Sequence, residues 1–373
     1  MIYLDNSSTT HKKPFGVVWS QLMAVTKFSI NPSRAGYKRA QLTGEKVFKC
    51  RELFAETFGT TPDNVVFTSG CTMALNTAIF GCAKKGGHII ATVYEHNSVM
   101  RALERLKHTH NITYTIVEPN KSGKITPVEI QKHIKSNTYL VIVNHTSNVT
   151  GTTQNIESIG KMCKKHGLLF LVDGAQSVGH EYINMQQMNI NMLSIAGHKG
   201  LYAPEGIGAL LINNVTLTPL LYGGTGTYSN QIKQPLDIPE GLESGTPNLP
   251  GILGMYHGLK FVKRNQNKIN QKIENLTKTL ISELKQIPKI TLYSSNTHAG
   301  VVSFTLKGKD SSEVSDILDE KFGIATRSGL HCAPTIHRYL GTLKNGTTRI
   351  SLSYFNSKKD IQKCIEAIKK IAL

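Results

Sequence analysis

The sequence lacks the segments that mark membrane-spanning and secreted proteins. Its longest apolar runs, such as residues 168–172, have the length of a strand, whereas a membrane helix needs about 18 apolar residues in a row. The N-terminus has neither the basic start nor the apolar core of a signal peptide. There is also no internal repeat and no low-complexity tract. We therefore expect a soluble protein of the cytoplasm, and the length of 373 residues favours two domains.

Acidic residues are scarce: the chain has 25 Asp and Glu residues against 43 Lys and Arg residues, which gives a net charge of +18. The basic residues lie in short, dispersed clusters, with no long basic run, no interleaved aromatic residues and no zinc-finger spacing. Nucleic-acid binding is therefore not favoured. The preferred interpretation is a solvated basic surface that attracts an acidic partner protein.

Cysteine is also infrequent, and the six cysteines include no CxxC pair. Their spacing fits no metal site, and a chain of this size does not need disulfides to fold. We expect four of them to be buried structural residues, namely Cys50, Cys82, Cys163 and Cys364.

Short apolar runs rich in β-branched residues alternate with amphipathic segments from residue 64 onward. The strand candidates are 64–68, 88–93, 112–117, 139–145, 168–173, 192–197 and 207–212. This rhythm predicts an α/β protein with a mostly parallel, seven-stranded sheet covered by helices on both faces. Residues 301–373 read as a smaller α+β unit, and 252–285 as a long helical connection. We predict a large domain over residues 13–250 and a small domain made of residues 251–373 together with residues 1–12.

Ligands bind at the carboxyl ends of the strands in such sheets, so residues that follow strands carry most weight. The stretch 69–76, "SGCTMALN", places a glycine turn and a hydroxyl before a helix. It fits phosphate binding by helix amides, and it also fits ordinary helix capping. Asp173 ends an apolar strand, where it can face a protonated nitrogen or cap the next helix, and Gln176 lies one helical turn further on.

Lys199 lies in "IAGHKGLYAP" (195–204), an apolar turn lined by glycines after another strand. Such surroundings lower the pKa of a lysine, and the neutral amine can form a Schiff base with an aldehyde. A Schiff-base lysine, an aspartate facing a pyridinium nitrogen and a phosphate-binding helix start are together what pyridoxal 5′-phosphate requires.

The chain resembles the class V aminotransferase-fold family of pyridoxal-phosphate enzymes, and within it the cysteine desulfurase and selenocysteine lyase branch. Eight motifs and the lysine turn carry the likeness: "YLDNSSTT", "INPSRAGYKRA", "VVFTSGCTMALN", "YEHNSV", "NHTSNVTGT", "LVDGAQSVGH", "AGHKG", "ESGTPN" and "RSGLHCAP". The resemblance implies the type I fold of pyridoxal-phosphate-dependent transferases.

The resemblance assigns roles to residues around the cofactor ring. It implies that Lys199 forms the Schiff base and that Asp173 pairs with the pyridine nitrogen. His96, in "YEHNSV", matches the histidine stacked on the ring, with a catalytic role. Gln176 and Asn148 match groups around the phenolic oxygen, and Asn148 also contacts the substrate.

The phosphate site follows from the same resemblance. Cys71 and Thr72 match its backbone amides and hydroxyl, and His198 matches a further ligand. Thr246, in "ESGTPN", resembles the threonine that reaches the phosphate of the neighbouring subunit, which implies a homodimer with shared active sites. The family usually has serine at the position of Ala196, so one hydroxyl is missing here, worth about 1 kcal/mol.

The motif "RSGLHCAP" (327–334) distinguishes a desulfurase from a plain aminotransferase. Arg327 can bind an amino-acid carboxylate through two parallel hydrogen bonds. Cys332 precedes a short helix among basic neighbours and can be either a nucleophile or a buried structural residue; the motif favours the nucleophile. The resemblance then implies that L-cysteine becomes L-alanine while a persulfide forms on Cys332. The compact loop resembles the second group of desulfurases, which pass sulfur to a small acceptor protein.

Several alternatives stay open at this point. Leu330 stands where the family usually has histidine, which leaves the preference for cysteine or selenocysteine undecided. Another pyridoxal-phosphate reaction, such as that of a cysteine lyase, an epimerase or an aminotransferase, would leave Cys332 incidental. A non-enzymatic scaffold would require a decayed cofactor site, against which Lys199, Asp173 and His96 argue. The sulfur acceptor and its pathway (iron–sulfur cluster assembly, thiolated tRNA or selenium metabolism) are not indicated.

Overall fold

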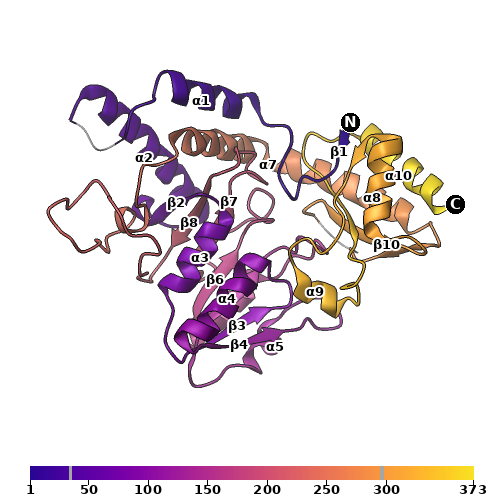
Figure 1. The fold of residues 1–373 in the computed structure, drawn as a ribbon, viewed down its shortest axis with the longest axis horizontal. Coiled ribbons are helices and arrows are strands. Elements are labelled where there is room, and N and C mark those ends of the chain that lie inside the picture. The colour runs from indigo at the N-terminus through magenta and orange to yellow at the C-terminus, as the bar shows by residue number, and fades with distance from the viewer. Residues whose placement is uncertain (33–35, 295–297) are drawn as a thin grey trace.

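The structure is a computed structural model that describes residues 1–32, 36–294 and 298–373. Figure 1 shows two lobes, one built around a large sheet and a smaller one that contains both ends of the chain. Three residues of the motif "INPSRAGYKRA", residues 33–35, lie outside the described residues.

The large sheet has seven strands in the order β2-β8-β7-β6-β5-β3-β4. They are β2 (Val65–Thr68), β3 (His88–Thr92), β4 (Thr113–Val117), β5 (Thr138–Asn144), β6 (Leu169–Asp173), β7 (Met192–Ala196) and β8 (Gly208–Ile212). Strand β8 is antiparallel to both of its neighbours, and the other pairings are parallel. The predicted α/β class with a mostly parallel, seven-stranded sheet is confirmed.

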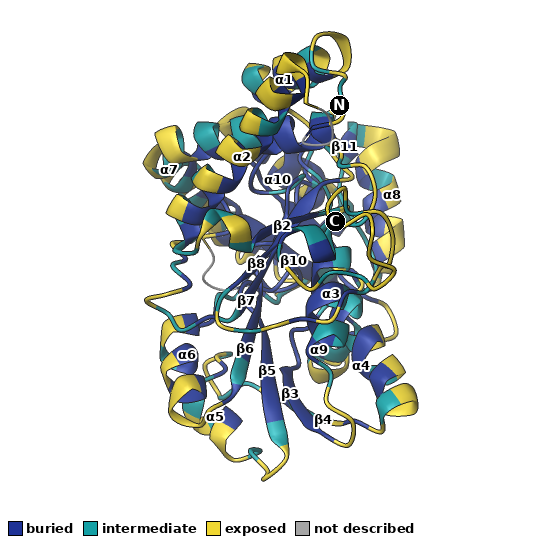
Figure 2. Ribbon diagram, turned by 90° about the vertical axis from the view of Figure 1, so that its left-hand side faces the viewer, coloured by how far each residue is buried: buried dark blue, intermediate teal, exposed yellow. Residues whose placement is uncertain are grey.

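Helices cover both faces of this sheet because its strands are apolar on both sides (Figure 2). In β5, Val141 and Val143 face one core and Leu140 and Ile142 face the other, and all four are fully buried. The helices of this lobe are α1 (Phe15–Thr26), α2 (Lys38–Phe58), α3 (Cys71–Gly81), α4 (Asn97–His110), α5 (Pro127–Gln131) and α6 (Ile156–Lys165). Helices α3 and α4 pack on one face, and α2 and α6 on the other. Among the described residues, no helix is long and apolar enough to cross a membrane.

The smaller lobe has its own sheets and its own core. Strands β12, β10 and β9 form an antiparallel sheet in that order, and β1 pairs with β11 in parallel. The elements are β1 (Ile2–Tyr3), β9 (Ile290–Leu292), β10 (Val301–Leu306), β11 (Ile324–Ala325), β12 (Thr348–Ser351), α8 (Ser311–Phe322), α9 (Pro334–Tyr339) and α10 (Lys358–Ala372). Leu4 from the chain start and Ile368 from α10 are buried in the same core, which explains why both chain ends lie in this lobe.

A single long helix, α7 (Leu249–Leu284), connects the two lobes. Its buried side chains up to Ile273 pack in the core of the large lobe, and those from Leu276 onward pack in the core of the small lobe. The predicted domain boundary between residues 250 and 251 falls in the first turn of this helix, and the boundary itself stays a prediction.

Candidate active site

A cavity of about 340 Å³ lies at the carboxyl edge of the large sheet. Nine of the eleven predicted site residues line it: Cys71, Thr72, His96, Asn148, Asp173, Gln176, His198, Lys199 and Arg327. Parallel strands end at the same edge of a sheet, which is why loops far apart in the sequence meet here. The other two predicted residues, Cys332 and Thr246, do not line this cavity.

Asp173 is the last residue of β6, and its side chain is nearly fully buried, with 2% exposure. Its Oδ1 atom accepts a hydrogen bond from the backbone N–H of Ala175 at 2.9 Å and one from the thiol of Cys71 at 3.4 Å. No hydrogen bond from the described residues reaches Oδ2. This oxygen is therefore available to a protonated ligand nitrogen, which a buried carboxylate requires.

Lys199 follows β7 in a turn that packs tightly against neighbouring backbone. A Cβ atom at Gly200 would lie 2.1 Å from the carbonyl oxygen of Val178, so glycine is required there. Burial lowers the pKa of the Lys199 amine. Its Nζ atom has no hydrogen-bond partner among the described residues. The turn therefore holds an unpaired amine that deprotonates more readily than a surface lysine, as a Schiff-base lysine must.

His96 caps the N-terminus of α4 with its ring. Its Nδ1 atom accepts a hydrogen bond from the backbone N–H of Ser98 at 3.1 Å. A nitrogen that accepts carries no proton, so the proton of the neutral ring lies on Nε2. Burial lowers the pKa of His96, although the nearby Asp173 carboxylate opposes this shift. His96 therefore contributes a neutral, flat imidazole to the cavity.

The part of the cavity lined by the start of α3 has the features of an anion site. Gly70, with φ of 148°, leads into α3, which begins at Cys71. The first N–H groups of a helix have no partner within it and attract anions. His198 lines the same cavity, its buried Nδ1 has no partner among the described residues, and burial lowers its pKa to about 4. Ala196 is also buried on this wall.

One glutamine and one asparagine of the cavity donate side-chain hydrogen bonds to backbone carbonyl groups. Gln176 donates from Nε2 to the carbonyl oxygen of Ser7 at 3.0 Å, and Asn148 donates from Nδ2 to that of His331 at 2.7 Å. The Oδ1 atom of Asn148 is buried and has no partner in the described part of the chain. It is an acceptor that a bound ligand can satisfy.

Two arginines, not one, reach the cavity. Arg327 lines the cavity, and its Nη1 atom donates a hydrogen bond to the hydroxyl of Ser8 at 2.8 Å. Arg349, in β12, was not predicted; it is 1% exposed and forms an ion pair with Asp5 at 2.7 Å. The Nε atom of Arg349 is buried without a partner among the described residues. The sequence carries no clear signal for Arg349, because "TRIS" is a mostly polar stretch whose burial appears only in the structure.

Cys332 lies beside this cavity rather than in it. All six cysteines are among the described residues, and Cys332 alone is exposed, whereas the four expected structural cysteines are buried. Its Sγ atom lies 3.7 Å from Nη2 of Arg327, which lines the cavity. Cys332 is therefore an exposed thiol next to a guanidinium of the cavity wall.

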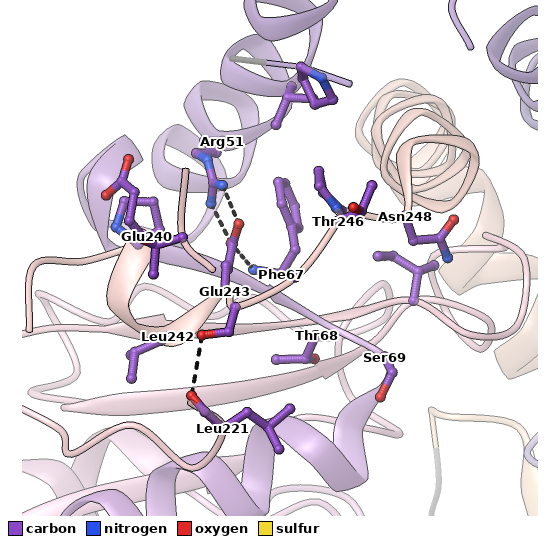
Figure 3. Close-up of a pocket in the computed structure, with 18 of the residues that line it drawn as sticks. Arg51, Phe67, Thr68, Ser69, Leu221, Glu240, Leu242, Glu243, Thr246 and Asn248 are labelled. Carbon is purple, nitrogen blue, oxygen red and sulfur yellow. Dashed lines mark hydrogen bonds and ion pairs between the residues drawn. The ribbon is translucent and has the colours of Figure 1, made fainter. Parts of the chain in front are cut away.

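Thr246 lines a second cavity of about 420 Å³ (Figure 3). Ser69 and Gly206 line both cavities. The loop that carries Thr246 is held by Glu243, whose carboxylate pairs with Arg51 through bonds of 2.8 and 2.7 Å. The Thr246 side chain is exposed and therefore accessible to another chain.

Glu95 is a buried acid that the sequence analysis missed. It is fully buried next to His96, and its Oε1 atom accepts from the Thr92 hydroxyl at 2.6 Å and from the Asn144 N–H at 2.8 Å. Its Oε2 atom has no partner among the described residues. Burial raises the pKa of Glu95 to about 8 although the hydrogen bond from Thr92 opposes this shift, so its carboxyl is protonated at neutral pH.

The Glu95 carboxyl should make stability depend on pH. The pKa of this carboxyl is 4.5 in the unfolded chain and about 8 in the folded chain. Between these two pH values the unfolded chain has lost the proton while the folded chain keeps it, so folding stability falls as pH rises. We expect the unfolding free energy of the wild type, relative to that of Glu95→Gln, to fall by about 3 kcal/mol between pH 5 and pH 8. Urea unfolding of both proteins measures this difference. A difference that stays constant with pH would contradict the assignment.

The residues described so far form a buried polar cavity on an α/β fold, and comparison with known proteins identifies the family. The sequence profile of the aminotransferase class-V family matches residues 2–364, so the chain belongs to this family. The predicted family and fold class are thereby confirmed.

Individual relatives within the family carry more specific names. The chain is 31% identical to a protein named probable cysteine desulfurase from Pyrococcus abyssi (strain GE5 / Orsay), over 100% of this chain and 94% of that protein. It is 31% identical to a protein named cysteine desulfurase IscS from Clostridium botulinum (strain Hall / ATCC 3502 / NCTC 13319 / Type A), over 99% of this chain and 94% of that protein. The solved apo structure of a cysteine desulfurase from Thermococcus onnurineus NA1 matches with a TM-score of 0.92 at 31% sequence identity. The match covers 100% of this chain and 94% of that chain.

Proposed function

We propose that this protein is a pyridoxal-phosphate-dependent cysteine desulfurase that converts L-cysteine to L-alanine and keeps the sulfur as a persulfide on Cys332. One observation carries the proposal: the single exposed cysteine lies 3.7 Å from an arginine on the wall of the Lys199 cavity. The names of the relatives support the same activity.

The residues of the cavity fit pyridoxal 5′-phosphate. Asp173 has one carboxylate oxygen free for the pyridine nitrogen, and Lys199 has an unpaired amine for the aldehyde. The amides at the start of α3 and the orphaned Nδ1 atom of His198 suit the phosphate, as Thr72 does at the same helix start. When bound, this cofactor draws electrons away from the substrate Cα atom and makes its proton removable.

The protein groups then divide the remaining work. Arg349 and Arg327 bind the α-carboxylate of the amino acid, since both guanidinium groups reach the cavity. Lys199 takes the proton from Cα and returns a proton to the product. The thiolate of Cys332 attacks the substrate sulfur, the substrate C–S bond breaks and an S–S bond forms. One thiol and one cysteine thus give one persulfide and one alanine, with no outside oxidant.

Product analysis tests this proposal directly. The purified protein, loaded with pyridoxal 5′-phosphate and given L-cysteine and a reducing thiol, should release sulfide and alanine in equal amounts. Pyruvate and ammonia in place of alanine would show an elimination reaction and overturn the proposal. The same assay with L-selenocysteine measures the substrate preference that Leu330 leaves open.

We also propose that the active enzyme is a homodimer with shared sites. Thr246 is exposed on a loop held in place by the Arg51–Glu243 pair, and it does not line the Lys199 cavity of its own chain. A second copy that presents Thr246 to this cavity would add a hydroxyl for the phosphate, in a site where Ala196 supplies none.

Shared sites lead to a complementation result. Thr246→Ala should weaken retention of pyridoxal 5′-phosphate about tenfold, because one hydrogen bond to a charged phosphate is lost. Mixed dimers of Thr246→Ala and Lys199→Ala chains should regain wild-type retention at one of their two sites, as measured by visible absorbance after dialysis. If mixing restores nothing, Thr246 does not act across the dimer.

The fate of the sulfur follows from the exposure of Cys332. A persulfide on an exposed loop is accessible to another protein, and the excess of basic residues favours an acceptor with an acidic surface. A small sulfur-acceptor protein of the cytoplasm is the partner that we propose.

A further inference from the structure

The backbone at the nucleophile adopts an unusual conformation. His331 and Cys332 have φ values of 48° and 57°, in the left-handed region that residues with a Cβ atom rarely adopt. They are the one adjacent pair of non-glycine residues with positive φ in the described part of the chain. Such a conformation persists only where surrounding contacts hold it, and it is concentrated at functional sites.

Two hydrogen bonds from the large lobe hold the carbonyl groups of this turn. The Nδ2 atom of Asn148 donates to the carbonyl oxygen of His331 at 2.7 Å. The backbone N–H of Asn97, at the start of α4, donates to that of Cys332 at 2.7 Å. From the small lobe, Thr347 accepts from the His331 ring at 3.1 Å. Asn148 and His331 both line the Lys199 cavity, and Asn148 is the one of the two that belongs to the large lobe.

The chemistry of the two partners fixes the orientation of the Asn148 amide. The carbonyl oxygen of His331 can only accept, so the amide nitrogen must face it. The amide oxygen, Oδ1, therefore points away from His331. It is buried and has no hydrogen-bond partner among the described residues, and Asn148 as a whole is 6% exposed. The backbone of Asn148 is fixed as well, since its carbonyl oxygen accepts from Nη1 of Arg349 at 3.1 Å.

We propose that Asn148 is a positioning residue for Cys332. The nitrogen end of its amide holds the strained His331–Cys332 turn, and the oxygen end receives a hydrogen-bond donor from the ligand in the cavity. Ligand binding fixes the amide and thereby steadies the turn that presents the sulfur nucleophile. The part of this inference that concerns the ligand rests on the proposed function; the hold on the turn does not.

Hydrogen–deuterium exchange of the peptide that covers 328–336 tests the hold on the turn. The N–H of Ala333, which donates to the carbonyl oxygen of Leu330 at 2.9 Å, reports on this turn. In cofactor-free protein, Asn148→Ala should speed its exchange about threefold to tenfold, the effect of one lost hydrogen bond. Asn144→Ala is the matched control, because Asn144 is a buried asparagine of the same cavity that does not bond to the turn. It should leave the exchange unchanged.

Asn148→Asp provides a second variant in case the alanine variant does not fold. It keeps the size of the side chain but cannot donate to a carbonyl group, so the same acceleration is expected. Exchange at the wild-type rate in the Asn148 variants, or equal acceleration in Asn144→Ala, would overturn the proposal.

Repeating the measurement with pyridoxal 5′-phosphate and L-alanine tests the coupling to the ligand. Addition of both should slow exchange of this peptide at least threefold in the wild type and leave it unchanged in Asn148→Ala. The same slowing in the variant would overturn the coupling. If the wild type produces no sulfide from cysteine while the cofactor-free exchange shifts as expected, the proposed function fails and the hold of Asn148 on the turn stands.

Discussion

Replacement of Cys332 by serine is expected to lower sulfide release from L-cysteine by about a thousandfold or more, while the visible absorbance of the bound cofactor stays as in the wild type. A serine hydroxyl is far less nucleophilic toward sulfur than a thiolate. The residues that fit the cofactor are not altered, because Cys332 does not line the cavity. Loss of turnover without loss of absorbance therefore separates sulfur transfer from cofactor binding.

The matched control is Cys82→Ala, which removes a buried thiol that does not line the cavity. It should keep both the absorbance and the sulfide release. A Cys332→Ser protein that releases sulfide at the wild-type rate would show that another group accepts the sulfur, and the role assigned to Cys332 would be wrong.

Replacement of Lys199 by alanine should remove both activity and the covalent attachment of the cofactor. Among the described residues that line the cavity, Lys199 alone carries an amine that can bind an aldehyde and carry the Cα proton, and loss of such a base alone costs about 10²–10⁴-fold. We expect sulfide release to fall by at least this factor. The absorbance of added pyridoxal 5′-phosphate should be that of the free aldehyde, and borohydride reduction should leave no cofactor on the protein.

Lys124→Met is a suitable control for the lysine. Burial lowers the pKa of Lys124 as it does that of Lys199, but Lys124 donates to the carbonyl oxygen of Thr153 and does not line the cavity. Its replacement should leave the borohydride-fixed cofactor in place. Covalent cofactor on the Lys199→Ala protein would mean that a different lysine forms the Schiff base.

Much of this site could be predicted because polar residues that follow apolar strands are conspicuous in a sequence. Asp173 ends β6 and Lys199 lies three residues after β7, and the rule that parallel strands end at one edge places them together. The long helical connection predicted over 252–285 is observed as Leu249–Leu284, because its apolar residues keep a helical period across both lobes.

Other features depend on contacts between distant segments, and the sequence could not indicate them. Arg349 looks like an ordinary residue of a short strand until Asp5 and the cavity lie next to it. Histidine and cysteine adopt the left-handed conformation only rarely, so the turn at His331 and Cys332 could not be predicted from these residue types. Hydrogen bonds from Asn148 and Asn97 hold it. Glu95 stands beside a predicted site residue, yet only its burial reveals the protonated acid.

The central claim is that Cys332 accepts the sulfur of L-cysteine, and the most direct test is the mass of the peptide that contains it. After brief incubation of the cofactor-loaded protein with L-cysteine and alkylation without a reducing thiol, the Cys332 peptide should carry one additional sulfur atom. The peptides of Cys50, Cys71, Cys82, Cys163 and Cys364 should not. A Cys332 peptide of unchanged mass from protein that is forming alanine would contradict the account.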